Sequence, residues 1–137
     1  MKIAFTTQDQ VHINAHFGSA SKIDVYEISA DGYEFVETLR FGGDLKEDGN
    51  EDKLAPKVEA LADCTIVYVS SIGGSAAARL IKKRITPVKA KSEEEEINDV
   101  LTRLVQTLKG NPPPWLRKAL QQKSQSFEEL EAEEAIV

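Results

Sequence analysis

The stretch TIVYVSSIGGSAAARLIKKRITPVKA, residues 65–90, constrains the fold of this chain more than any other feature. Residues 65–71 form a continuous apolar run, which is typical of a strand buried on both faces of a sheet. A Gly-Gly-Ser turn follows, then residues 76–84 with apolar side chains on one side of a helix, and then a second strand at residues 85–90. Pro87 indicates that this second strand lies at an edge. The stretch therefore predicts a β–α–β unit with parallel strands.

The segments before and after this unit extend the pattern to a mixed sheet with helices on its faces. Strands are predicted at residues 2–7, 22–29 and 33–41, and the last two are joined by the hairpin signal Ala30-Asp31-Gly32. Helices are predicted at residues 51–63, from Ser92 with Glu93 to Glu96 in its first turn, and at residues 111–122. With the first strand beside the 65–71 strand, a right-handed crossover gives the sheet order 3-2-1-4-5. This order predicts an α/β fold of ribonuclease-H-like topology with five strands.

The composition indicates one globular domain from a reducing compartment. The 137 residues suffice for a single hydrophobic core, which we expect over residues 1–121, followed by an acidic and flexible tail at residues 122–137. Cys64 is the only cysteine, so an internal disulfide is ruled out and a cytoplasmic location is expected. The sequence shows no signal peptide and no apolar run long enough for a membrane span, so we expect no membrane association.

The distribution of charge limits the kinds of molecule that the protein is expected to bind. The net charge is −6, but residues 128–137 hold five acids and no base, so the rest of the chain carries 17 basic and 18 acidic residues. A nearly neutral body argues against binding to duplex nucleic acid. From Cys64 to Ser92, by contrast, there are six basic residues and no acid. We expect this stretch to favour an anion.

The loop VHINAHFGSA at residues 11–20, which we name the histidine loop, holds both histidines of the chain, His12 and His16. Parallel strands end at one edge of a sheet, and ligands of open α/β sheets bind at that edge. The predicted topology brings the histidine loop there, together with residues 70–75 and two lysines that end the last strand. The Gly-Gly-Ser turn opens a helix, whose free N–H groups favour an anion.

Catalytic chemistries fit these residues less well. The spacing of the two histidines is that of zinc ligands on a helix, but the Glu of an HExxH motif is absent. A two-metal nuclease needs carboxylates at the strand ends, where Thr6, Thr7, Ser70 and Ser71 stand instead. A serine nucleophile needs a partnered base, and the local sequence supplies none. We therefore expect no enzymatic activity. The plainer alternatives are surface histidines and a Gly-Gly-Ser turn that serves close packing.

Four strings of the sequence resemble one protein family. They are NAHFGSA in the histidine loop, EDGNEDKLAPKVEAL, DCTIVYVSSIGGSAAARLIKKRITPVK and NPPPWLRKAL. Together they resemble the NifX-type branch of the dinitrogenase iron–molybdenum cofactor biosynthesis family over residues 2–121. The HFG string marks the broad family, and the EDGNEDKL and PPPWL strings point to the branch.

The resemblance implies a ribonuclease-H-like domain that performs no hydrolysis. Members of the family are small carriers that bind the iron–sulfur precursor of the cofactor, or the later cofactor, and pass it between assembly proteins. The implied partners are a NifB-type maturase, scaffold proteins and apo-dinitrogenase. The family's functional histidine maps to His16, which becomes a candidate iron ligand of the cluster. The resemblance assigns no role to His12 or Cys64.

The residues and the resemblance together predict a cluster-binding surface at the carboxyl edge of the sheet. A sulfide-rich anionic cluster needs positive potential, N–H donors and few ligands, since a full thiolate set would hold it too firmly to be passed on. The predicted binding residues are His12, His16, Phe17, Gly18, Ser71, Gly73, Gly74, Ser75, Lys89 and Lys91. The alternative is a non-catalytic interaction module without a cluster. The sequence leaves open which cluster form is bound, whether His16 ligates iron or hydrogen-bonds a sulfide, and the oligomeric state.

Overall fold

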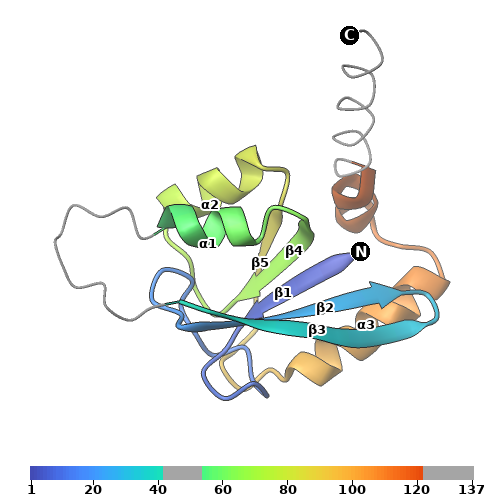
Figure 1. Ribbon diagram of the computed structural model, residues 1–137. Coiled ribbons are helices and arrows are strands. Elements are labelled where there is room, and N and C mark those ends of the chain that lie inside the picture. Colours follow the sequence, from blue (N-terminus) through green and yellow to red (C-terminus); the bar gives the residue numbers. More distant parts are fainter. Residues whose placement is uncertain (42–53, 122–137) are drawn as a thin grey trace, which may run out of the picture.

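The computed structural model describes residues 1–41 and 54–121, which form a sheet covered by helices (Figure 1). The strands are β1 (Lys2–Thr6), β2 (Lys22–Ser29), β3 (Gly32–Arg40), β4 (Cys64–Val69) and β5 (Thr86–Lys89). The labelled helices are α1 (Leu54–Ala60), α2 (Gly74–Lys82) and α3 (Ile97–Lys109), and a further helix covers residues 114–121. The tail predicted at residues 122–137 and the first residues of the helix predicted at 51–63 lie outside the described residues.

The sheet has the predicted strand order, β3-β2-β1-β4-β5. β1 is antiparallel to β2 and parallel to β4, and β4 is parallel to β5, so β1, β4 and β5 end at the same edge. All six residues of β4 are buried, as its apolar run predicts. β5 lies at the edge of the sheet that Pro87 indicates. The mixed α/β architecture is confirmed, and the ribonuclease-H-like label stays a prediction.

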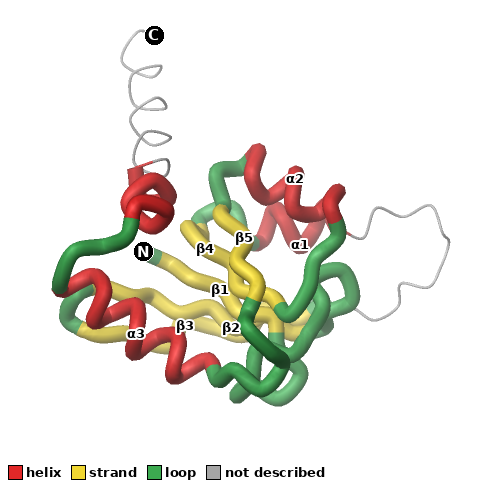
Figure 2. The backbone as a smooth tube through the Cα atoms, turned by 180° about the vertical axis from the view of Figure 1, so that it is seen from behind, coloured by secondary structure: helices red, strands yellow, loops and turns green. Residues whose placement is uncertain are grey.

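Two hydrophobic cores lie on opposite faces of the sheet, each beneath its own helices (Figure 2). The first core lies between the sheet and α1 and α2, and contains Leu61, Leu80 and Phe17 of the histidine loop. The second lies beneath α3 and contains Phe5, Leu101 and neighbouring apolar side chains of α3. Alternate residues of a strand point to opposite faces, so the same strands serve both cores. The histidine loop contributes Ala15, Phe17 and Ala20 to the first core and Ile13 to the second.

The predicted start of α3 at Ser92 is wrong, because α3 begins at Ile97. Backbone groups of the preceding segment pair with the histidine loop: the Ile13 N–H donates to the Glu95 carbonyl at 2.9 Å, and the Ile97 N–H donates to the Val11 carbonyl at 2.8 Å. These long-range hydrogen bonds hold residues 95 and 96 against the loop, so Glu93 to Glu96 do not form the first turn of α3. Local capping signals do not contain this information.

The short helix predicted at residues 111–122 is present at 114–121, and its first residue is Pro114, the last of three prolines. Figure 1 shows it following α3 at the end of the described chain. None of the helices in residues 1–41 and 54–121 combines the length and the apolar character that crossing a membrane requires.

Candidate functional site

The histidine loop is attached to the end of β4 as a short extension of the sheet. The Ser70 N–H donates to the Ala15 carbonyl at 3.2 Å, and the Phe17 N–H donates to the Ser71 carbonyl at 2.9 Å. His16 and Ser71 therefore form a parallel bridge. At the end of β1, the buried Thr6 hydroxyl also donates to the Ala15 carbonyl at 2.7 Å. The predicted meeting of the histidine loop with the end of β4 is present in the structure.

Burial alternates along this extension, and the alternation sets the direction of the His16 side chain. Ile13, Ala15 and Phe17 are buried, and His16 between them is exposed. An extended backbone sends successive side chains to opposite sides, so the packing of Phe17 in the core turns the imidazole outward. The ring of Phe17 is fully buried and does not face a ligand on the surface. Of the predicted binding pair, Phe17 anchors the loop and His16 is presented to solvent.

A buried lysine, Lys57 of α1, holds the histidine loop from the core side. Its side chain is 5% exposed, and its ammonium donates to the Phe17 carbonyl at 2.9 Å and the Gly18 carbonyl at 2.8 Å. The ammonium also lies 5.9 Å and 5.7 Å from the ring centroids of Phe17 and Phe41, within the range of a cation–π contact. A positive charge is thus placed directly behind the loop that carries His16.

The sequence prediction missed Lys57, although the spacing of Lys57 relative to its apolar neighbours indicates a buried position. Lys57 lies three residues after Leu54 and four before Leu61, which is the spacing of one helix face. A lysine on the apolar face of a short helix is rarely buried without a partner. That pattern predicts a buried cation, but not that its acceptors are the carbonyls of a loop about forty residues earlier.

The imidazole of His16 is oriented by one local hydrogen bond. Its Nδ1 accepts the Gly18 N–H at 3.0 Å. A neutral imidazole that accepts at Nδ1 carries its proton on Nε2, so the outward nitrogen is a donor. A Cβ at position 18 would lie 3.3 Å from His16 Cε1 and 3.4 Å from His16 Nδ1. The absent side chain of Gly18 therefore leaves room for the ring to fold back onto the backbone.

The N-terminus of α2 lies next along the chain after Ser71 and opens to solvent. Gly73 is its N-cap residue, and no side chain among the described residues caps it. Gly73, Gly74 and Ser75 are exposed, and a Cβ built at either glycine meets no described atom within 4 Å. The first N–H groups of a helix lack intrahelical partners and carry the positive end of its dipole. This turn is therefore accessible to an anion.

His12 has a different environment from His16. Its Nδ1 lies 2.7 Å from Asp9 Oδ2, and its backbone bridges to Glu96. The hydrogen bond that the imidazole donates to the Asp9 carboxylate raises the pKa of His12 above its ordinary 6.5. The N–H groups of His12 and Val11, together with the imidazole, lower the pKa of Asp9. His12 thus shapes the start of the loop, and its ring is already engaged by a carboxylate.

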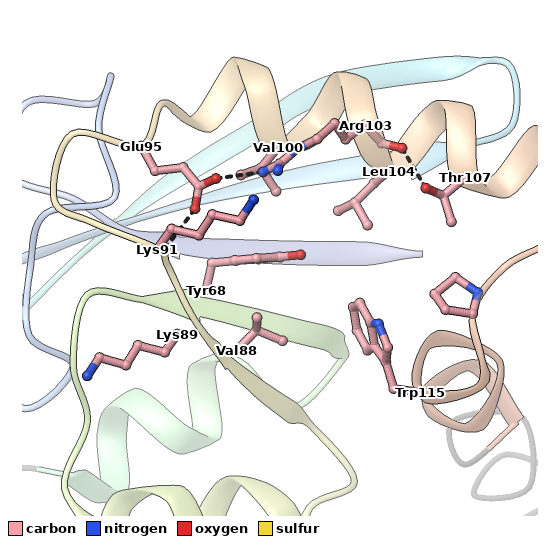
Figure 3. A pocket seen from close by; sticks show the side chains of 11 residues that line it. Tyr68, Val88, Lys89, Lys91, Glu95, Val100, Arg103, Leu104, Thr107 and Trp115 are labelled. Atoms are coloured by element: carbon pink, nitrogen blue, oxygen red, sulfur yellow. Dashed lines mark hydrogen bonds and ion pairs between the residues drawn. The ribbon is translucent and has the colours of Figure 1, made fainter.

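The two predicted lysines do not converge on His16. In Figure 3, the Lys91 side chain is directed towards Tyr68 on the α3 side of the sheet, and the Lys89 side chain points the opposite way. Cys64 is buried at the start of β4, at the other end of the strand from Ser71. The structure therefore brings His16 and Gly18 together with Ser71, the residue that leads into α2, while Lys91 belongs to a separate pocket.

The described residues do not place three or more His, Cys, Asp or Glu side chains where they could hold a metal ion. The edge offers one outward imidazole, the open turn of α2 and the buried charge of Lys57 instead. Such a surface can bind an anion through N–H donors and contribute one nitrogen ligand at most. It resembles a docking surface more than a closed metal site.

Comparison with known proteins places the chain in a family. Residues 1–107 match the family described as dinitrogenase iron-molybdenum cofactor. The chain is 55% identical over 121 residues to the protein NifX of Herbaspirillum seropedicae, covering 88% of this chain and 82% of that protein. It is 38% identical over 87 residues to the FeMo cofactor biosynthesis protein NifB of Bradyrhizobium diazoefficiens, covering 63% of this chain and 17% of that protein.

The fold is also found in a solved structure. The crystal structure of PH0822 superimposes with a TM-score of 0.60 at 20% identity, covering 77% of this chain and 89% of that chain. At this identity the likeness concerns the fold alone. The family match and the NifX similarity cover most of the sequence and agree with each other. This chain belongs to the dinitrogenase iron–molybdenum cofactor family and is a NifX-type protein.

Proposed function

We propose that this protein takes part in assembly of the nitrogenase iron–molybdenum cofactor and carries the iron–sulfur precursor of that cofactor between assembly proteins. The observation that supports the proposal most is the outward imidazole of His16 beside the strand end that leads into α2. Membership of the family, and the similarity to NifX and NifB proteins, support the same biological setting.

The strength with which this surface is expected to bind a cluster suits a carrier. A sulfide-rich cluster is anionic, and the N–H groups at the start of α2 and the ammonium of Lys57 supply positive potential. In the described residues no set of thiolates or carboxylates surrounds His16. A cluster held by one imidazole and several N–H groups can exchange to a partner that offers more ligands.

The hydrogen bond to Gly18 bears on how His16 meets the cluster. In the structure Nδ1 accepts an N–H, so Nε2 is protonated and can donate to a sulfide. Direct ligation of iron by Nε2 requires the proton to move to Nδ1 and the Gly18 contact to break, at a cost of about 1 kcal/mol. We propose that His16 first contacts the cluster as a hydrogen-bond donor, and that ligation follows only after the ring has released Gly18.

The experiment that tests the proposal is anaerobic loading with the cluster released by a NifB-type maturase. We expect the protein to emerge from gel filtration brown, with iron in a fixed ratio to the chain. We also expect the iron to leave the chain when a scaffold protein or apo-dinitrogenase is added. Protein that stays colourless at saturating cluster would contradict the carrier proposal.

The interaction module without a cluster remains the second candidate, because β3 presents apolar side chains to solvent. Tyr33, Phe35 and Val36 are 42%, 51% and 41% exposed on this edge strand. An exposed apolar edge strand is a common site of protein contact. If the protein is only an interaction module, it stays colourless after incubation with the cluster but still binds an assembly protein in a pull-down.

A further inference from the structure

A pocket of about 300 Å³ lies on the α3 side of the sheet, separate from His16. Its walls come from β4, β5, the segment between β5 and α3, α3 itself, and the start of the last helix with Pro113 before it (Figure 3). The volume is at the lower end of the range for small-molecule sites, about 300–1,000 Å³. Val88, Leu104 and Trp115 give the pocket largely apolar walls. Trp115 is 42% exposed, so a large aromatic ring stands open to solvent there.

The floor of the pocket holds the side chain of Tyr68, whose hydroxyl has no hydrogen-bond partner among the described residues. Tyr68 is 8% exposed, and its ring stacks on Phe5 with centroids 5.4 Å apart. Figure 3 shows the Tyr68 side chain lying across the pocket between Lys91 and Trp115. No residue in the described parts of the chain accepts or donates a hydrogen bond at the Tyr68 hydroxyl. Buried polar groups in native proteins are normally hydrogen-bonded, so this donor points to a ligand.

The charges beside the Tyr68 side chain leave the Lys91 ammonium without a partner among the described residues. Arg103 forms an ion pair with Glu95 at 2.6 Å, and the other Glu95 oxygen accepts the backbone N–H of Lys91 at 3.0 Å. Glu95 is therefore fully engaged. Among the described residues the Lys91 ammonium has no hydrogen-bond or ion-pair partner, and its side chain is directed towards Tyr68. Burial raises the pKa of Tyr68 to about 12, so its hydroxyl stays a donor at neutral pH.

We propose that this pocket binds a small organic carboxylate with an apolar body. The carboxylate lies between the Tyr68 hydroxyl and the Lys91 ammonium, and the apolar body packs against Trp115 and Leu104. Both Lys89 and Lys91 line the pocket, but only the Lys91 ammonium is directed towards Tyr68 in Figure 3. One cation beside the hydroxyl matches the single charge of a carboxylate better than the double charge of a phosphate ester. The site lies on the opposite face of the sheet from α2, so the proposal does not depend on the carrier function.

Trp115 is the only tryptophan, so its fluorescence reports on this pocket directly. The probes are hexanoate and cyclohexanecarboxylate, with hexanol and inorganic phosphate as controls. We expect a saturable change with both carboxylates and none with hexanol or phosphate. Absence of saturation with the carboxylates, or equal binding of hexanol or phosphate, would overturn the proposal.

Variants test the two polar contacts separately. Tyr68→Phe keeps the ring that stacks on Phe5 and removes only the hydroxyl, and Lys91→Met removes only the ammonium. We expect each to weaken carboxylate binding about tenfold, with thermal unfolding unchanged. Lys89→Met is the matched control, because Lys89 also lines the pocket but its ammonium is directed away from Tyr68 in Figure 3, and we expect wild-type affinity. Wild-type affinity in both Tyr68→Phe and Lys91→Met would also overturn the proposal.

Discussion

At the scale of single residues, the orientation of the His16 ring depends on the absence of a side chain at position 18. Gly18→Ala places a Cβ 3.3 Å from His16 Cε1, which is tighter than an ordinary van der Waals contact and requires the exposed ring to shift. We expect the ring to turn away and lose its contact with the Gly18 N–H. The free energy of unfolding should change by less than about 1 kcal/mol, because His16 is exposed. Cluster binding, followed by anaerobic titration, should weaken several-fold.

The crystal structure of the Gly18→Ala protein provides the control for that prediction. A ring that keeps its hydrogen bond to residue 18, with cluster binding unchanged, would show that the glycine does not position His16.

The interaction between Asp9 and His12 makes the stability of the histidine loop depend on pH. The pKa of His12 is raised above 6.5, so its stabilising contribution is complete below pH 6.5 and is lost as pH rises through the raised value. The pKa of Asp9 is lowered from 3.8, so its contribution is complete above pH 3.8 and is lost as pH falls through the lowered value. The pair therefore supports the loop most in the mildly acidic range between the two.

Asp9→Asn separates the two histidines in a titration followed by NMR. Because the carboxylate that raises the pKa of His12 is removed, the His12 pKa should fall towards 6.5. The amide oxygen of the variant can still accept the N–H groups of Val11 and His12, so the loop should keep its fold. An unchanged His12 pKa in this variant would mean that another group sets it.

Lys57 connects the core to the candidate site, and Lys57→Met tests that connection. The variant keeps the apolar stem and leaves the carbonyls of Phe17 and Gly18 without their donor. A charged hydrogen bond of this kind contributes about 1.5–3 kcal/mol, so we expect a loss of about 2 kcal/mol in urea unfolding. Cluster binding should also weaken. The exposed Lys82 provides the control, and Lys82→Met should change neither quantity.

At the scale of elements, α2 is the helix whose N-terminus faces the proposed cargo. Ser75→Asp adds an acid to a first turn that has none. An acid at this position stabilises a helix by about 0.3–1 kcal/mol, yet it repels an anionic cluster. We therefore expect stability and cluster binding to change in opposite directions, in thermal unfolding and anaerobic titration.

Ser75→Asn is the neutral control for that substitution. It has nearly the same size as Asp and should leave cluster binding close to wild type. If the Asp and Asn variants bind the cluster equally, the dipole of α2 has no part in binding.

The strands and the helices differ in how well the sequence predicts them. Period-two and continuous apolar patterns locate all five strands to within about two residues, because burial on a sheet determines those patterns directly. The predicted start of α3 is wrong because backbone groups of Ile13 and Val11 form hydrogen bonds with the backbone of Glu95 and Ile97. Such pairing between distant segments has no local signature in sequence.

At the scale of the whole molecule, the parallel arrangement of β1, β4 and β5 is what makes part of the site predictable. It places the histidine loop beside Ser71, and the structure bears this out. The separation of Lys91 from His16 could not be predicted, because it depends on which face of the sheet the chain follows after β5. The orientation of the His16 ring likewise depends on a contact with Gly18 that only the folded backbone defines.

The two faces of the molecule therefore have distinct expected uses. The edge with His16 and α2 is the proposed cluster surface, and the pocket with Tyr68 and Lys91 is a separate carboxylate site. Loss of one should not abolish the other, since among the described residues no hydrogen bond links the side chain of His16 to that of Tyr68 or Lys91.

The central claim is that His16 is the main cluster contact, and the most direct test compares the two histidines. After anaerobic loading and gel filtration, iron per chain is measured for the wild type, His16→Ala and His12→Ala. Loss of one hydrogen bond to a charged group predicts about tenfold or greater weakening for His16→Ala, with a wild-type circular dichroism spectrum. His12→Ala should retain most of the iron, since its ring is engaged by Asp9. Equal iron in the wild type and His16→Ala would contradict the claim.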